Sequence, residues 1–173
     1  MESIYRTLRK ISFEVIIVNN SQNDLGMASL KESYPQVRII QNATNVGFAK
    51  ANNQAALSAQ GKTLLFLNPD TILADQAIEK MVAHLESNPD IGALGPKVSN
   101  ADGSLQYSCR RFPTLMTGFF NRYSLLSRWF PDNPYTVQYL MKDYYHDENR
   151  EVDWLSGCCI MVPHDVFEKA GGF

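Results

Sequence analysis

Residues 63–70 read TLLFLNPD, and this stretch indicates the fold class. The run Thr63–Leu67 is apolar and has the length of a buried strand, which the turn sequence at 68–70 then ends. A helical stretch at about 48–60 precedes the strand. Apolar residues at helical spacing follow it and predict an amphipathic helix that ends before Pro89: Ile78, Met81, Val82 and Leu85. Helix, strand and helix in succession are typical of a parallel sheet covered by helices.

The same alternation continues on both sides of this strand. Toward the N-terminus we expect a helix with Ile4, Leu8 and Ile11 on one face, a strand at 13–18, a helix at 25–33 and a strand at 37–40. Toward the C-terminus we expect a strand at 91–94, a hairpin turn at Asn100–Gly103, one or two helices within 112–145 with loops at Pro131 and Pro134, a last strand at 151–162, and a helix from Val166 capped by Asp165. The sequence therefore predicts a single α/β domain with a mostly parallel sheet and helices on both faces.

Composition and charge narrow the function classes. The 173 residues are 45% hydrophobic and 20% charged, and the net charge of −2 gives no electrostatic support for nucleic-acid binding. Cys109, Cys158 and Cys159 cannot all pair within one chain, so we expect reduced thiols and a cytoplasmic location. No zinc-ligand spacing and no signal peptide are visible, and no run approaches the roughly 18 apolar residues of a membrane-spanning helix.

Polar clusters mark where chemistry is expected. Clusters at 19–24 and 68–70 follow predicted strands, at the carboxyl ends where parallel α/β sheets bind ligands. A third, at 45–53, opens a helix whose free N–H groups suit anions. Asp70 is a candidate to hold a divalent cation together with a ligand's phosphates, and Asn68 to add an oxygen ligand. The alternative for all three clusters is turn and loop chemistry without a ligand.

Taken in order, these segments resemble family 2 glycosyltransferases over nearly the whole chain. The similar stretches are FEVIIVNNS at 13–21, NVGFAKANN at 45–53, LLFLNPD at 64–70, GPK at 95–97 with NADGSLQ at 100–106 and RRFP at 110–113, and WLSGCCIMV at 154–162 with GGF at 171–173. The LLFLNPD stretch resembles the form of the family's DxD motif that is common in rhamnosyltransferase-like members.

The resemblance implies a GT-A fold and an enzyme that moves a sugar, such as rhamnose or another hexose, from a nucleotide-diphosphate donor. The acceptor would be a saccharide or lipid-linked acceptor in polysaccharide biosynthesis, and the transfer would be inverting. A divalent metal, Mg²⁺ or Mn²⁺, would bridge the diphosphate at Asp70. The implied donor-binding residues are Asn19, Asn20, Ser21, Asn45, Gly47, Asn53, Asn68 and Asp70, and the implied acceptor-side residues are Trp154, Ser156 and Gly157.

Departures from the family pattern set further expectations. Asn19 stands where the family usually has an aspartate that contacts the base or ribose, and an amide lacks that charge. The family's first strand does not precede residues 1–11, and its catalytic base would lie beyond Phe173, with neither Asp165 nor Glu168 expected to replace it. We therefore expect residues 1–95 to be a nucleotide-sugar-binding half and 96–173 the start of an acceptor-side half, in a chain that is poorly stable or that swaps or dimerises.

Three alternatives remain open at this point. The chain is either an active transferase, a non-catalytic remnant of one, or an unrelated α/β binding domain in which every motif is a turn or a cap. Aromatic and basic residues between 112 and 145 add the possibility of contact with a membrane surface, against the alternative that they line the core and the acceptor pocket. Those residues are Phe119, Phe120, Trp129 and Phe130, with Arg122 and Arg128.

Overall fold

The structure, a computed structural model, describes residues 1–22, 26–115, 117, 129 and 133–173. Two compact units make up the chain: Met1–Leu94 together with Met161–Phe173, and Gly95–Ile160. Among the described residues, no helix combines the length and apolar character needed to cross a membrane. Some predictions concern residues outside this set. They are the loop residues 23 and 24, the first residue of the helix predicted from residue 25, and the aromatic and basic residues at 119, 120, 122, 128 and 130.

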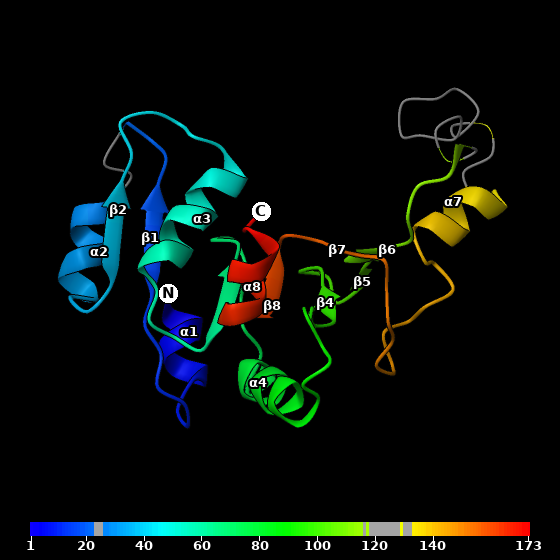
Figure 1. The fold of residues 1–173 in the computed structure, drawn as a ribbon, viewed down its shortest axis with the longest axis horizontal. Coiled ribbons are helices and arrows are strands. Elements are labelled where there is room, and N and C mark those ends of the chain that lie inside the picture. Colours follow the sequence, from blue (N-terminus) through cyan, green and yellow to red (C-terminus); the bar gives the residue numbers. More distant parts are fainter. Residues whose placement is uncertain (23–25, 116, 118–128, 130–132) are drawn as a thin grey trace. The chain divides into compact units, whose positions relative to one another are not determined.

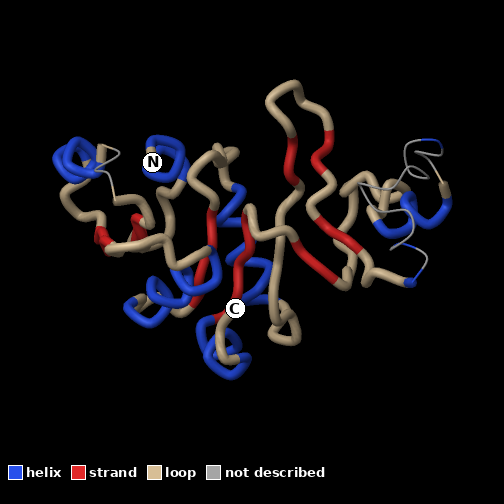
Figure 2. The backbone as a smooth tube through the Cα atoms, turned by 90° about the horizontal axis from the view of Figure 1, so that it is seen from above, coloured by secondary structure: helices blue, strands red, loops and turns tan. Residues whose placement is uncertain are grey.

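The first unit alternates helices and strands along the chain; Figure 2 colours the helices of the chain blue and its strands red. Its elements are α1 (Glu2–Thr7), β1 (Ile16–Asn19), α2 (Met27–Ser33), β2 (Arg38–Gln41), α3 (Phe48–Ser58), β3 (Thr63–Leu67), α4 (Ala77–Ser87), the end of β8 (Cys159–Pro163) and α8 (His164–Ala170). β1 and β2 run parallel and side by side, in a register that joins Ile16 to Arg38 and Asn19 to Gln41 (Figure 1). β3 pairs with β8, and α3 packs against β1.

The core of this unit lies between α4 and the strands. Leu73, Met161 and the apolar face of α4 are buried together there. The predicted stripe of α1 and the segment after it packs against this cluster, through Ile4, Leu8 and Ile11. The helix expected to carry all three is shorter than predicted: α1 ends at Thr7, and Leu8 is its extended C-cap, so only Ile4 of the three is helical.

The second unit is built from short antiparallel ladders. Its elements are β4 (Val98–Ser99), β5 (Leu105–Gln106), β6 (Cys109–Arg110), α7 (Pro134–Tyr139) and β7 (Trp154–Leu155). β4 and β5 form the predicted hairpin, closed at its turn by the bond from the Gly103 N–H to the Asn100 carbonyl (2.9 Å). β6 pairs with β7, and Cys109, Met141 and Tyr144 form the buried cluster beneath them.

Several predicted elements differ from the structure for local reasons. The strand expected at 13–18 begins only at Ile16, and residues 91–94 form a single bridge, Leu94 with Met161, because Pro96 follows and has no N–H to extend the pairing. A turn at Gly157–Cys158 divides the strand expected at 151–162 into β7 and β8.

Two predictions at helix starts were also wrong. Asp165 does not cap the last helix: α8 begins at His164 with Pro163 in the capping position. The N–H of His164 instead donates to the Lys62 carbonyl at 2.9 Å, which anchors the helix start to the chain before β3. Pro134 lies in the first turn of α7 rather than in a loop, a position where its missing N–H costs nothing.

Candidate functional site

The carboxyl ends of β1 and β2 carry a set of hydrogen-bonded amides. Asn19, the last residue of β1, is 6% exposed. Its Oδ1 accepts from the Ser21 N–H (3.0 Å), and its Nδ2 donates to Oε1 of Gln41 (2.8 Å). The Gln41 amide then donates to the Ser21 carbonyl at 2.7 Å. Asn19 and Gln41 therefore hold the shape of the loop at 19–21.

A second set of amides lies one residue further along the same two strands. Nδ2 of Asn42 donates to Oδ1 of Asn20 and to Oε1 of Gln54, both at 2.8 Å, and Gln54 returns a bond to Oδ1 of Asn42 at 3.2 Å. Asn20 donates in turn to the Gly47 carbonyl at 3.4 Å. These contacts join the loop after β1, the end of β2 and helix α3.

The start of α3 is set by a glycine in an unusual backbone conformation. Gly47 is its N-cap, with φ 85° and ψ 171°, a conformation that essentially only glycine adopts. Oδ1 of Asn45 accepts from the Gly47 N–H at 2.9 Å and so fixes the approach to the helix. N–H groups in the first turn of a helix have no partner within the helix, and the helix dipole adds positive potential there.

The side chain of Asn53 bonds the backbone of the last residue, Phe173, rather than the amides described above. Its amide donates to the Phe173 carbonyl (3.2 Å) and accepts from the Phe173 N–H (3.0 Å). Gly172 lies so close that a Cβ there would be 2.9 Å from the Asn53 Oδ1. The Phe173 ring also packs edge-on against Phe66 of β3, with ring centroids 4.6 Å apart. These contacts give Asn53 the role of holding residues 172–173 on α3.

Asn68 and Asp70 occupy the turn directly after β3. The Asn68 carbonyl accepts from both the N–H (3.3 Å) and the hydroxyl (2.7 Å) of Thr71, which closes the turn and leaves Asp70 exposed to solvent. In the part of the chain that the structure describes, no group of three or more histidine, cysteine or acidic side chains could hold a metal ion. A single exposed carboxylate does fit the usual Mg²⁺ arrangement, in which phosphates and waters supply the remaining ligands.

The acceptor-side residues all lie in the second unit. Trp154 of β7 is 49% exposed, and the Arg110 guanidinium lies 5.8 Å from the centre of its ring. The N–H of Ser156 donates to the Ser108 carbonyl at 2.7 Å, which extends the β6–β7 pairing, and Gly157 forms the turn that follows. This leaves a cationic and aromatic surface at Arg110 and Trp154.

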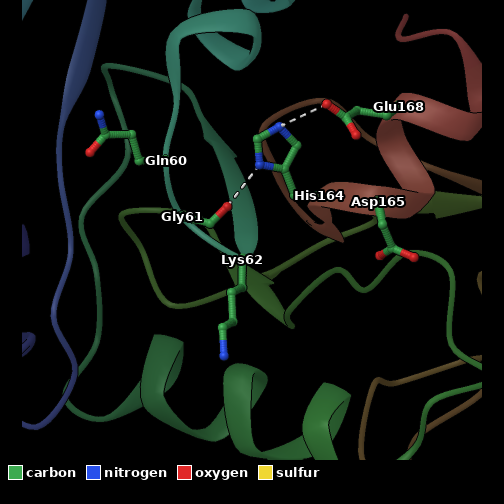
Figure 3. Close-up of a pocket in the computed structure, with 6 residues that line it drawn as sticks. All are labelled: Gln60, Gly61, Lys62, His164, Asp165 and Glu168. Atoms are coloured by element: carbon green, nitrogen blue, oxygen red, sulfur yellow. Dashed lines mark hydrogen bonds and ion pairs between the residues drawn. The ribbon is translucent and has the colours of Figure 1, made fainter.

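A hollow in the described part of the chain is lined by none of these residues. It has a volume of about 480 Å³ and lies before β3 and along α8 (Figure 3). His164 spans two of the lining segments: its Nδ1 bonds the Gly61 carbonyl (2.8 Å), and its Nε2 faces Glu168 (3.8 Å). The neighbouring carboxyl of Asp165 has a pKa below its usual value, because the Lys169 ammonium donates a hydrogen bond to it.

Comparison with known proteins identifies the family. The model of the family described as "Glycosyl transferase family 2" matches residues 2–169. The chain belongs to glycosyl transferase family 2. This membership confirms the resemblance seen in the sequence motifs.

Two relatives of this family 2 chain are bacterial proteins with assigned names. It is 28% identical over 171 residues to an N-acetylglucosaminyl-diphospho-decaprenol L-rhamnosyltransferase of Mycobacterium tuberculosis, covering 92% of this chain and 54% of the relative. It is 27% identical over 179 residues to the O-antigen biosynthesis protein RfbC of Myxococcus xanthus, covering all of this chain and 13% of that protein. The chain thus spans about half the length of the first relative and a small part of the second.

A solved structure confirms the predicted fold. The mannosyltransferase PcManGT from Pyrobaculum calidifontis, in complex with GDP-Man and Mn²⁺, superposes with a TM-score of 0.59 at 17% sequence identity. The match covers 99% of this chain and 41% of the mannosyltransferase. The family 2 chain therefore has the α/β, GT-A-like fold expected from its motifs.

Three residues of the amide sets were missed by sequence reasoning: Gln41, Asn42 and Gln54. The pair at 41–42 ends β2 as Asn19-Asn20 ends β1, so paired polar residues at the ends of two neighbouring parallel strands were the available signal. Gln54 gave no signal, because its role depends on the packing of α3 against β1.

Proposed function

We propose that this family 2 chain binds a nucleotide-diphosphate sugar at the carboxyl ends of β1, β2 and β3. The observation that carries the proposal is the amide-lined loop at 19–21, which is bonded to the start of α3 through Asn20 and Gly47. Amides offer both donors and acceptors, which suits the edges of a base and the hydroxyls of a ribose. The N–H groups at the start of α3 suit the diphosphate.

Each implied donor residue has a role in this proposal except Asn53, whose amide bonds the Phe173 backbone. Asn19, Asn20 and Ser21 contact the nucleoside directly or shape the loop that does so. Asn45 and Gly47 present the helix start to the phosphates. Asn68 and Asp70 hold a divalent cation, Mg²⁺ or Mn²⁺, with the diphosphate. When bound, such a cation supplies Lewis-acid stabilisation to the departing nucleotide.

The reaction proposed for the whole protein is inverting transfer of a hexose or deoxyhexose, such as rhamnose, to a saccharide or lipid-linked acceptor. The name of the mycobacterial relative, a rhamnosyltransferase with a decaprenol-linked substrate, supports both the sugar and the acceptor class. The exposed Trp154 and the partly buried Arg110, beside Ser156 and Gly157, form the surface that we propose for the acceptor, since an indole face packs on sugar rings and a guanidinium pairs with phosphate.

Calorimetric titration tests the donor site. UDP, dTDP and GDP are titrated into the chain with and without Mn²⁺, beside Asp70→Ala and the control Asp90→Ala, which removes an exposed acid after α4. We expect metal-dependent binding of at least one nucleotide that Asp70→Ala weakens at least tenfold and Asp90→Ala leaves unchanged. Binding that ignores both the metal and Asp70 would overturn the assignment of the cation to this turn.

A further inference from the structure

Matched amides end the two parallel strands in consecutive register. Asn19 lies opposite Gln41, and the next residues, Asn20 and Asn42, are joined by a side-chain hydrogen bond of 2.8 Å. Both strands end at the first pair, and Asn20 and Asn42 begin the loops that follow. The second pair is the one on the side of α3, where Asn42 also bonds Gln54.

The direction of the hydrogen bonds on the α3 side is fixed by the backbone. The Gly47 carbonyl can only accept, so it orients the Asn20 amide with Nδ2 toward it and Oδ1 toward Asn42. Asn42 must therefore present its Nδ2 to Asn20, and the same amide group then also serves Oε1 of Gln54. Asn42 thus donates to both neighbours through Nδ2, and its Oδ1 accepts from Gln54 in return.

We propose that Asn42 is a positioning residue for nucleotide binding: it sets the orientation of Asn20 and so couples the loop after β1 to the start of α3. This inference rests on the proposed function, because both coupled segments belong to the proposed donor site. Asn42 itself need not touch the nucleotide. Its half-buried side chain acts by holding Asn20 in the one orientation that also satisfies the Gly47 carbonyl.

Removing the side chain of Asn42 leaves Oδ1 of Asn20 without this donor. The Asn20 amide is then free to rotate, and its bond to Gly47 is long enough, at 3.4 Å, to be lost at little cost. The loop and the helix start would then have to be ordered by the nucleotide. We expect Asn42→Ala to weaken nucleotide binding about tenfold, which corresponds to about 1.4 kcal/mol.

Gln54→Ala is the matched control. It removes the other partner of Asn42 on α3 but leaves the bond between Asn42 and Asn20 in place. A purely structural role for the amide set predicts that both variants lower the melting temperature and that neither, once folded, changes the dissociation constant. A positioning role predicts similar losses of melting temperature in both variants, but a larger dissociation constant for the nucleotide in Asn42→Ala alone.

The experiment is a double-mutant cycle read out by calorimetry with the nucleotide that binds the unaltered chain, with Mn²⁺ present, and by thermal unfolding. The four proteins are the unaltered chain, Asn42→Ala, Asn20→Ala and the double variant, with Gln54→Ala beside them. We expect the tenfold effect of Asn42→Ala to fall below twofold when Asn20 is already alanine, because the two changes act through one bond.

The outcomes separate this inference from the proposed function. Failure of the unaltered chain to bind any of the nucleotides overturns both. Binding by the unaltered chain with an unchanged dissociation constant in Asn42→Ala, or with equal losses in Asn42→Ala and Gln54→Ala, overturns the positioning role alone. An undiminished effect in the Asn20→Ala background also overturns it. If Asn42→Ala does not fold, the isosteric Asn42→Asp replaces it, and nucleotide binding is measured at two salt concentrations. The effect of the lost donor persists at high salt, whereas repulsion between the new carboxylate and the diphosphate is screened.

Discussion

Replacing Gly47 by alanine tests the proposed phosphate site through its backbone. Gly47 has φ 85° and ψ 171°, and a Cβ there would meet nothing within 4 Å. The substitution therefore adds no steric clash and only imposes backbone strain, which for an L-residue in this region costs about 1–3 kcal/mol. If the strain is retained, a loss near 2 kcal/mol lowers the melting temperature of a domain of this size by roughly 4–8 °C.

The loop can instead relax to relieve the strain, and binding then suffers. Relaxation moves the Gly47 N–H away from Asn45 and turns the start of α3 from its present direction. Restoring that direction when the nucleotide binds would cost the same strain, so we expect the dissociation constant of the nucleotide to rise by up to about 25-fold, the equivalent of about 2 kcal/mol. The loss in free energy of unfolding and the loss in free energy of nucleotide binding should together amount to the backbone strain, about 1–3 kcal/mol.

Gly103→Ala is the control for this experiment. Gly103 also has a positive φ, 83°, and open space around it, but it lies in the β4–β5 hairpin turn of the other unit. Thermal unfolding and calorimetry on both variants separate the two effects: Gly103→Ala should lose stability alone, whereas Gly47→Ala should lose stability, nucleotide affinity or a share of each. A Gly47→Ala variant that binds the nucleotide as tightly as the unaltered chain, with unchanged stability, would refute the reasoning from backbone geometry.

Two further predictions concern a buried thiol and a docked backbone. Burial raises the pKa of Cys159 to about 12 from the ordinary 9.0, so the folded state keeps a proton that the unfolded state loses. The free energy of unfolding should therefore fall by about 1.4 kcal/mol per pH unit between pH 9 and 12 on account of this thiol. Urea unfolding at pH 8 to 10.5 measures this free energy, which should fall less steeply with pH in Cys159→Ala. Equal dependence on pH in the two proteins would contradict the burial. Asn53→Ala removes both bonds to the Phe173 backbone, and at about 1 kcal/mol per bond it should lower the melting temperature while leaving the nucleotide dissociation constant within twofold. A large loss of affinity with unchanged stability would instead make Asn53 a direct ligand.

The sequence predicted an element well where residues that break a strand or helix flank a regular apolar pattern. The strand at 63–67 was predicted at its true bounds, because Gly61-Lys62 and Asn68-Pro69 limit an uninterrupted apolar run. The helix through Ile78 and Leu85 was predicted for a similar reason: its apolar stripe is regular and Pro89 follows it. The ordered motifs also identified the family and the fold, which the comparisons confirm.

The parts that were missed depend on contacts between distant residues. The start of α8 follows from the bond between His164 and Lys62, which lie on separate segments that no local pattern connects. The Asn42 and Gln54 side chains are twelve residues apart and meet only because α3 packs on β1. The engagement of Asn53 by Phe173 spans 120 residues, so the motif could suggest a polar role but not the partner.

The location of the nucleotide is the central claim, and amide hydrogen exchange tests it most directly. Exchange is measured on the chain alone and with saturating nucleotide diphosphate and Mn²⁺. We expect slower exchange in peptides that cover 16–22, 42–50 and 67–72, with no change at Gly61-Lys62 and His164, which line the hollow beside α8. Protection at that hollow, with none at the ends of β1, β2 and β3, would contradict the account.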